Sequence, residues 1–227
     1  MPKKPKKKLS LQWKQQSVIM FEIIYKGILI GLCISVPLGP IGMLTIQRTL
    51  NKGQKYGIAT GLGATTSDLI YTIITLFFLN FVIDLIESHK FIIQLLGSLV
   101  VVVFGWYIYR SNPSQQPKPN ESVKKHSLPG DFFTSFGLTL SNPLILFVLI
   151  ALFARFEFIT KQSDFFTLIC GLISILGGAL LWWAALTFLV SHFKDKLNMR
   201  ELKIINQVTG VVIILIGCVG TILSLIK

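Results

Sequence analysis

Apolar residues run along this chain in long blocks that short polar connections separate. A helix needs about 20 apolar residues to cross a bilayer, and six blocks are that long. They cover residues 27–47, 57–83, 91–109, 132–154, 165–191 and 204–226. The pattern predicts an all-α polytopic membrane protein with six transmembrane helices, and little chain remains for any further domain.

One connection is much longer than the others. Residues 111–131 are polar and rich in proline, which is typical of a flexible linker. This linker separates residues 27–110 from residues 132–227, so that each side holds three spans. Residues 1–26 form a basic N-terminal tail and a lead-in to the first span.

An eight-residue pattern occurs once in each half of the chain. It reads G-L-C-I-S-V-P-L in the first half and G-L-T-L-S-N-P-L in the second, which pairs Gly31 with Gly137, Ser35 with Ser141 and Pro37 with Pro143. Proline breaks a spanning helix, and the freed backbone groups are tolerated only where they face protein or a water-lined cavity. A chance match between two apolar segments is the alternative to a true duplication.

The number of spans in each half also determines the relative orientation of the two halves in the membrane. Because three is an odd number, the second copy enters the membrane from the opposite side. The sequence therefore predicts two inverted three-helix repeats. In such proteins the breaks meet near the midplane, where secondary transporters bind their substrates.

Composition supports a membrane protein. The chain is 52% hydrophobic and 14% charged, with a mean hydropathy of +0.67, which excludes an ordinary soluble domain. The net charge of +12 comes largely from the connections and the tail. A basic tail beside a span more often contacts anionic lipid than nucleic acid, so membrane lipid is the expected partner and nucleic acid is discounted.

The basic residues give two conflicting orientations. The first, third and fifth connections hold 11 Lys and Arg, and the second and fourth hold 3. This bias places the odd connections in the cytoplasm and the N-terminus outside, whereas the lysine-rich tail favours the reverse. Translation from Met20 would delete the tail and remove the conflict, and the orientation stays open until the native N-terminus is known.

Asp68 is the one acidic residue well inside any of the six predicted spans. A charge at the centre of a spanning helix costs roughly 2.5 to 3.5 kcal/mol on insertion scales, so Asp68 should face the protein interior. Gly57, Gly61 and Ala64 share its helix face, which predicts close packing there. Asp68 would bind a cationic substrate group or carry a coupling proton. A structural interhelical hydrogen bond is the alternative.

Other polar residues near the breaks complete the candidate site. Substrate or proton binding is assigned to Asp68, Asn142, Ser35, Ser141 and Thr65, and broken-helix geometry to Pro37, Gly39, Pro40 and Pro143. A helix restarted after a break exposes N–H groups that attract a carboxylate. Together with a buried acid, these groups suit a zwitterion such as an amino acid.

Three segments of the first half resemble the lysine-exporter (LysE/RhtB) translocator family. They are P-L-G-P from Pro37, the basic turn from Gln47 to Gly57 and G-L-G-A-T-T-S-D ending at Asp68. Asn142-Pro143 matches an Asn-Pro pair in that family's fourth span. The resemblance covers about residues 27–226 and implies a secondary active transporter that exports amino acids or related metabolites across the inner membrane, coupled to protons.

Two positions depart from the family pattern, and both touch the presumed site. An extra residue separates Pro37 from Gly39, where the glycine usually follows the proline directly. Leu144 follows Asn142-Pro143 where many members carry Lys. The substrate is therefore open, and an ion or other small-solute carrier remains the main alternative to an amino-acid exporter.

Other chemistries have weaker support in the sequence. A membrane thiol–disulfide carrier is disfavoured because Thr139 is the repeat partner of Cys33 and no C-x-x-C occurs. The histidines lie in connections or at span ends, so no metal or other cofactor is expected. No nucleophile and base come together within the spans, which argues against an enzyme.

Three further features bear on packing and gating. Arg48 is expected to contact lipid phosphate or to form part of a gate, and the lipid contact is preferred. Trp182 and Trp183 could line a cavity, although such aromatics more often only pack. The small residues Gly171, Ser174 and Gly178 predict a close helix contact, either within one chain or between chains of a homo-oligomer.

Overall fold

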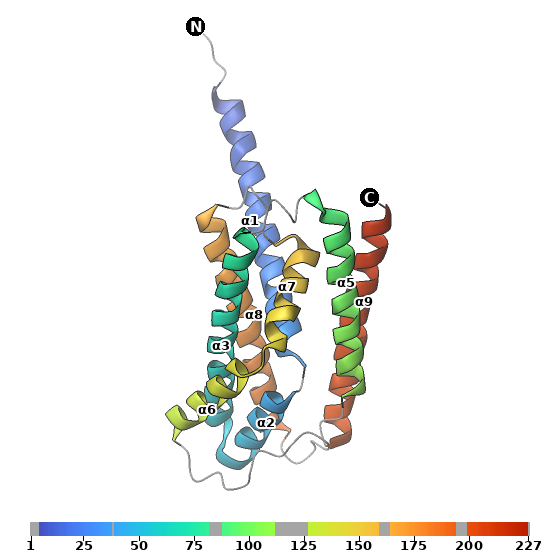
Figure 1. Cartoon of the computed structure of the whole chain (residues 1–227). Helices are drawn as coiled ribbons and strands as arrows, with labels where there is room; N and C mark the ends of the chain where they lie inside the picture. Colours follow the sequence, from blue (N-terminus) through green and yellow to red (C-terminus); the bar gives the residue numbers. More distant parts are fainter. Residues whose placement is uncertain are drawn as a thin grey trace.

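All regular structure in the described part of the chain is helical (Figure 1). The computed structural model describes residues 5–37, 39–81, 88–111, 127–158, 164–193 and 199–226. The helices are α1 (Pro5–Ser35), α2 (Pro40–Lys52), α3 (Gln54–Phe81), α5 (Lys90–Arg110), α6 (Leu128–Leu140), α7 (Leu144–Phe156), α8 (Phe165–His192) and α9 (Met199–Ile226). The predicted all-α class is confirmed.

Five of these helices are long and apolar enough to cross a membrane. They contribute Gln16–Ser35, Gln54–Phe78, Phe91–Arg110, Phe165–His192 and Lys203–Leu223. A sixth crossing results if α6 and α7, which meet at a bend of 69°, form one broken span. The predicted six-span count therefore depends on this broken pair, and the break within it is the one predicted at Pro143.

The first span differs from the prediction. It covers Gln16–Ser35, whereas the apolar pattern placed it at 27–47. The chain breaks after Ser35, and α2 then forms a separate helix that carries Gln47, Arg48 and Lys52. These polar side chains explain why α2 does not continue the span. A start at Met20 would remove the first four residues of the span found here.

Local sequence signals explain several helix boundaries. Pro40 occupies the first turn of α2, where its missing N–H costs nothing. Gly53 ends α2 with a φ of 105°, a conformation that favours glycine. Asp164 caps α8 by accepting a hydrogen bond from the Thr167 amide at 3.0 Å. Pro129 similarly starts α6 within the predicted linker, most of which lies outside the described residues.

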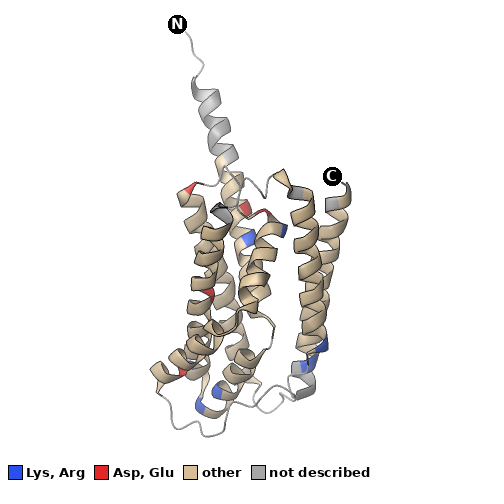
Figure 2. Cartoon of the chain, in the orientation of Figure 1, with Lys and Arg blue, Asp and Glu red and all other residues tan. Residues whose placement is uncertain are grey.

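The crossings alternate in direction, as Figure 1 shows. In the chain direction α1, α5 and α8 run one way, and α3, the α6–α7 pair and α9 run the other. Figure 2 shows most charged residues at the two ends of the bundle. We call the end that carries Lys52, Lys55 and Arg110 the basic end. The acidic residue midway along α3 in Figure 2 is Asp68, the one acid in that helix.

Small residues allow the helices to approach closely. A side chain at Gly31 of α1 would collide with the Ile175 carbonyl of α8, and one at Gly178 would collide with the backbone of Ile28. The predicted small-residue face of α8 therefore packs within the chain, against α1. Gly61 of α3 likewise meets the Trp183 side chain of α8, so the predicted packed face of α3 is confirmed.

Large apolar side chains lie both inside and outside the bundle. A buried cluster joins α1, α7 and α8 through residues such as Ile30, Leu149 and Ile175. Phe21, Phe77 and Phe165 are more than 70% exposed, on surfaces that a bilayer would cover. The chain is a multi-pass membrane protein.

Both copies of the repeated pattern occupy equivalent places. The first runs through the end of α1 into the break before α2, and the second runs through the end of α6 into the break before α7. Their glycines pack differently, because Gly31 contacts α8 whereas Gly137 has open space around it. The two-fold axis of an inverted repeat stays a prediction.

Candidate functional site

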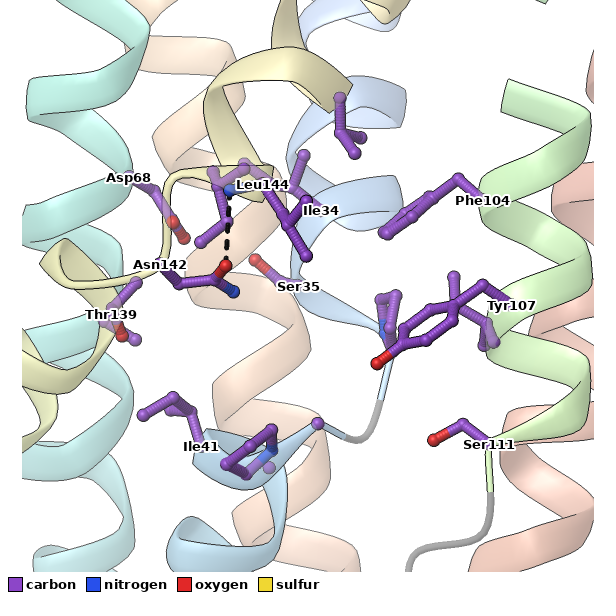
Figure 3. A pocket seen from close by; sticks show the side chains of 18 of the residues that line it. Ile34, Ser35, Ile41, Asp68, Phe104, Tyr107, Ser111, Thr139, Asn142 and Leu144 are labelled. Atoms are coloured by element: carbon purple, nitrogen blue, oxygen red, sulfur yellow. Dashed lines mark hydrogen bonds between the residues drawn. The ribbon is translucent and has the colours of Figure 1, made fainter. Parts of the chain in front are cut away.

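A cavity of about 170 Å³ lies where the two breaks meet (Figure 3). Such a volume holds on the order of ten water molecules, which suits a small metabolite better than a lipid. Six of the nine predicted site residues line it: Ser35, Pro37, Gly39, Pro40, Asp68 and Asn142. The structure thus brings together residues from the first, second and fourth predicted spans.

The other three predicted site residues lie outside the lining. The Thr65 hydroxyl donates to the Gly61 carbonyl at 2.9 Å, and the Ser141 hydroxyl donates to the Gly137 carbonyl at 2.8 Å. Both hydroxyls are therefore engaged by their own helices. Pro143 shapes the start of α7 without reaching the cavity.

Asp68 projects from α3 into the cavity. Its side chain is only 5% exposed, and Figure 3 shows it directed toward the same region as Asn142 and Ser35. Its carboxylate has no hydrogen-bond or ion-pair partner among the described residues. The expected alternative, a structural interhelical hydrogen bond, is therefore not formed there. A buried carboxylate without a partner is costly, so a ligand or a proton would stabilise it.

Three buried donors also face this cavity without partners. They are the Ser35 hydroxyl of α1, the Thr139 hydroxyl of α6 and the Trp183 indole N–H of α8. All three side chains are at most 5% exposed, and none of these atoms finds a partner in the described part of the chain. Buried donors normally have partners, so these three are available to a ligand.

Thr139 and Trp183 were not among the nine predicted site residues, and for Trp183 packing was preferred to the cavity-lining position that the structure shows. Thr139 was recognisable as a polar residue near the second break, two residues before Ser141, and as the repeat partner of Cys33. Trp183 reaches the cavity because Gly61 of α3 leaves room for its side chain. A glycine facing an aromatic residue on another helix cannot be identified until the helix pairing is known.

The starts of α2 and α7 differ in their capacity for an anion. Ile41 and Gly42, in the first turn of α2, line the cavity, and no side chain caps that turn. At α7, Asn142 Oδ1 accepts a hydrogen bond from the Leu144 amide at 3.2 Å, and the next two amides find carbonyl partners. The expected anion attraction therefore fits α2 and not α7.

One wall of the cavity is apolar apart from the Tyr107 hydroxyl. Phe104 and Tyr107 project from α5 on the side opposite Asp68 (Figure 3), and Ile145 and Val148 come from α7. Among the described residues that line the cavity, Asp68 is the one acid, and there is no Lys or Arg. The site thus offers one negative group, several neutral donors and an apolar surface.

A second buried charge cluster lies at the basic end, between α2, α3 and α6. Arg48 Nε is 3.2 Å from Asp131 Oδ1, and Lys52 Nζ is 3.1 Å from Asp131 Oδ2. The Arg48 guanidinium also donates to the Thr60 hydroxyl at 2.9 Å, to the Asp131 carbonyl at 2.7 Å and to the Thr134 hydroxyl at 2.7 Å. The five residues are called the Arg48 cluster below.

The Arg48 cluster corrects two expectations. Arg48 is 5% exposed and is covered by α3 and α6, so the preferred contact with lipid phosphate is wrong. Asp131 is fully buried. Its burial was not predicted, because residue 131 lies in the predicted flexible linker. Asp68 is therefore not the only buried acid of the helices, but it is the one at the cavity.

Other potential reactive groups are scattered. The three cysteines are free thiols on α1, α8 and α9. In the ranges that the structure describes, no three His, Cys, Asp or Glu side chains gather as a metal ion would require.

Comparison with known proteins identifies relatives over most of the chain. The family model described as "LysE type translocator" matches residues 32–223. The "Putative amino acid efflux protein YcgF" of Bacillus subtilis (strain 168) is 25% identical over 198 residues, which cover 86% of this chain and 93% of that protein. No solved structure matches.

Two other relatives are matched over smaller parts of their length. The "Putative protein TIC 214 N-terminal part" of Anthoceros angustus is 28% identical over 87% of this chain, but the match spans only 19% of that protein. The "Uncharacterized membrane protein YahN" of Escherichia coli (strain K12) is 28% identical over 49% of this chain and 50% of its own length.

Proposed function

This chain belongs to the LysE type translocator family, and on that premise we propose that it exports amino acids or related small metabolites across the inner membrane in exchange for protons. The family match confirms the resemblance found in the sequence. The relative YcgF bears the name of an amino acid efflux protein, which supports the choice of substrate.

One observation carries the proposal: the Asp68 carboxylate lies buried and unpartnered in a cavity between two helix breaks. An ionisable residue in that position marks a substrate or proton pathway. The cavity is too small for a lipid and large enough for an amino acid.

A single carboxylate also suggests how protons drive export. It can hold a proton or pair with a substrate ammonium, but it cannot do both at once. A proton that enters from outside would displace the substrate, and a substrate that enters from the cytoplasm would displace the proton. Competition for Asp68 therefore produces exchange without a second acid, Lys or Arg among the described lining residues.

The Arg48 cluster is proposed as part of the gate at the basic end. It joins α2, which follows the first break, to α6, which precedes the second. If α2 and α6 separate, the ion pairs of Asp131 break and the path from the basic end widens. The bias of basic residues favours the cytoplasm for that end.

An inverted repeat fits the helix contacts. The main pairs are α1 with α8, α3 with α6, and α5 with α9. A two-fold axis that exchanges the halves would interchange the first two pairs and map the third onto itself. The alternating directions of the crossings agree with this arrangement (Figure 1).

The test measures labelled amino acids in everted membrane vesicles with an acidic interior. We expect accumulation that depends on the proton gradient with the unmodified protein. Asp68→Asn should insert normally and lose this accumulation, while Asp68→Glu should retain part of it. Asp164→Asn makes the same chemical change at an exposed helix cap, where Asn serves as well, and should behave like the unmodified protein.

Two outcomes would contradict the proposal. If Asp68→Asn transports at the original rate, Asp68 is not the coupling group. If no amino acid accumulates with any variant, the protein carries another metabolite or an ion.

A further inference from the structure

Four polar groups at the cavity have no partner among the described residues: one carboxylate and three groups that can donate a hydrogen bond. The ionised Asp68 carboxylate only accepts hydrogen bonds, and the Trp183 indole N–H only donates. The Ser35 and Thr139 hydroxyls also have protons to donate and lack acceptors. A ligand that satisfies all four must itself combine a donor, such as an ammonium group, with an acceptor, such as a carboxylate.

The start of α2 can bind the carboxylate of such a ligand. Its first turn is uncapped by any side chain and lines the cavity at Ile41 and Gly42, where the positive end of the helix dipole favours an anion. Ser35 ends α1 just before the break and lines the same cavity. The unpartnered buried hydroxyl of Ser35 is a second, independent feature that needs an acceptor.

Apart from Tyr107, Ser111, Asn142 and Asn206, which carry polar groups, the rest of the lining is apolar. Phe104 of α5 and Ile145 and Val148 of α7 are apolar, and they adjoin the buried core between α1, α5 and α7. Figure 3 shows Phe104 across the cavity from Asp68. A substrate whose ammonium binds Asp68 would therefore direct its third substituent toward α5 and α7.

We infer that the cavity selects a neutral amino acid with an apolar side chain. The ammonium pairs with Asp68, the carboxylate accepts hydrogen bonds from Ser35 and from the start of α2, and the side chain packs against Phe104. Thr139 and Trp183 donate to the remaining carboxylate lone pairs. This inference rests on the proposed export function and adds the substrate class to it.

Charged side chains are rejected because no described lining residue near the apolar wall carries the opposite charge. The second ammonium of lysine would lie against Phe104 and Val148 without a carboxylate, and the second carboxylate of glutamate would find no Lys or Arg among the described lining residues. An unpaired charge in an apolar environment is costly, which gives discrimination by exclusion.

The test is competition against labelled leucine in everted vesicles that carry the unmodified protein. Unlabelled leucine and phenylalanine should compete at least about tenfold better than alanine, because each missing methylene in an apolar pocket lowers affinity by about that factor. Lysine and glutamate should compete weakly. If leucine does not accumulate but another amino acid does, the same competition is measured with that amino acid as the labelled substrate.

Phe104→Glu adds a second carboxylate to the apolar wall. It should reduce leucine transport and raise the ratio of lysine to leucine transport at least about tenfold, since lysine then has a partner for each ammonium. Phe104→Leu keeps the wall apolar and should retain the original ranking. A folded Phe104→Glu protein with an unchanged ranking would overturn the placement of the side chain against α5.

The outcomes separate the two proposals. If the unmodified protein prefers lysine or glutamate, the substrate inference is wrong and the export function stands. If no amino acid accumulates at all, amino-acid export itself fails, and the protein carries another metabolite or an ion. Because the ranking of the unmodified protein decides the question, the inference remains testable even if Phe104→Glu does not insert.

Discussion

Arg48 and Asp131 form a buried ion pair across 83 positions of the chain, with 3.2 Å between Nε and Oδ1. The pair joins α2 of the first half to the first turn of α6 in the second. Lys52 adds a second cation to the same carboxylate. The two halves of the chain are thus held together at the basic end by charge.

Removing the Asp131 carboxylate should destabilise the protein. Asp131→Asn leaves Arg48 and Lys52 without an anionic partner, and breaking a buried pair in this way costs about 3 to 5 kcal/mol. Thermal unfolding in detergent micelles measures the loss. Arg48→Lys keeps the charge but cannot reproduce the bonds to Thr60 and Thr134, so it should also be less stable than the unmodified protein.

The cluster also makes a prediction about transport. If it is a gate, Arg48→Lys should change the rate of substrate exchange under conditions in which the variant remains folded. Unchanged stability and exchange in both variants would show that the cluster neither holds nor gates the bundle.

The basic end should face the cytoplasm. Ser127 lies at that end, before α6, and Asp164 lies at the other end, before α8. In a protein without its native cysteines, Asp164→Cys should react with an impermeant maleimide on intact cells. Ser127→Cys should react only after permeabilisation. The reverse pattern would assign the orientation that the lysine-rich tail favours.

Close packing of α1 on α8 should not tolerate a side chain at Gly31. Gly31→Ala places a methyl group against the Ile175 carbonyl, and overpacking of this kind costs about 1 to 3 kcal/mol. Gly177→Ala is the matched control on α8, because nothing lies within 4 Å of the added methyl group. Thermal unfolding should separate the two variants, and equal stability would contradict the close approach.

The three cysteines should be dispensable for export. They lie on different helices, and the repeat partner of Cys33 is Thr139, which cannot form a disulfide. Replacement of Cys33, Cys170 and Cys218 by Ala should leave transport within about twofold of the original rate, since single free cysteines behave as small apolar residues. Loss of activity on replacing Cys33 alone would support a thiol–disulfide carrier.

Hydrophobic patterning predicted most of the fold because spanning helices leave long apolar blocks in the sequence. It misplaced the first span because α2 begins with apolar residues and only then becomes polar at Gln47 and Arg48. The apolar block joined α2 to the end of α1. The repeated motif located both helix breaks, since Pro37 and Pro143 each remove a backbone donor.

The candidate site was only partly accessible from the sequence. Asp68 was identifiable because a lone acid in an apolar span is costly wherever it faces lipid. Asp131 could not be identified from the sequence. Its partner Arg48 lies in the other half of the chain, and only the pairing of α2 with α6 brings them together. Trp183 was not assigned for the same reason, since its role depends on the contact with Gly61.

The bend between α6 and α7 has a consequence for how the protein is made. Each of these helices has 13 residues, about 20 Å of helix, which is shorter than the roughly 30 Å hydrocarbon layer. Neither can insert as an independent span, and α6 also carries the Asp131 carboxylate. The first half emerges from the ribosome earlier, so Arg48 and Lys52 are already present when that carboxylate reaches the membrane. Biosynthesis from the N-terminus would then supply the counter-charge before the acid that requires it.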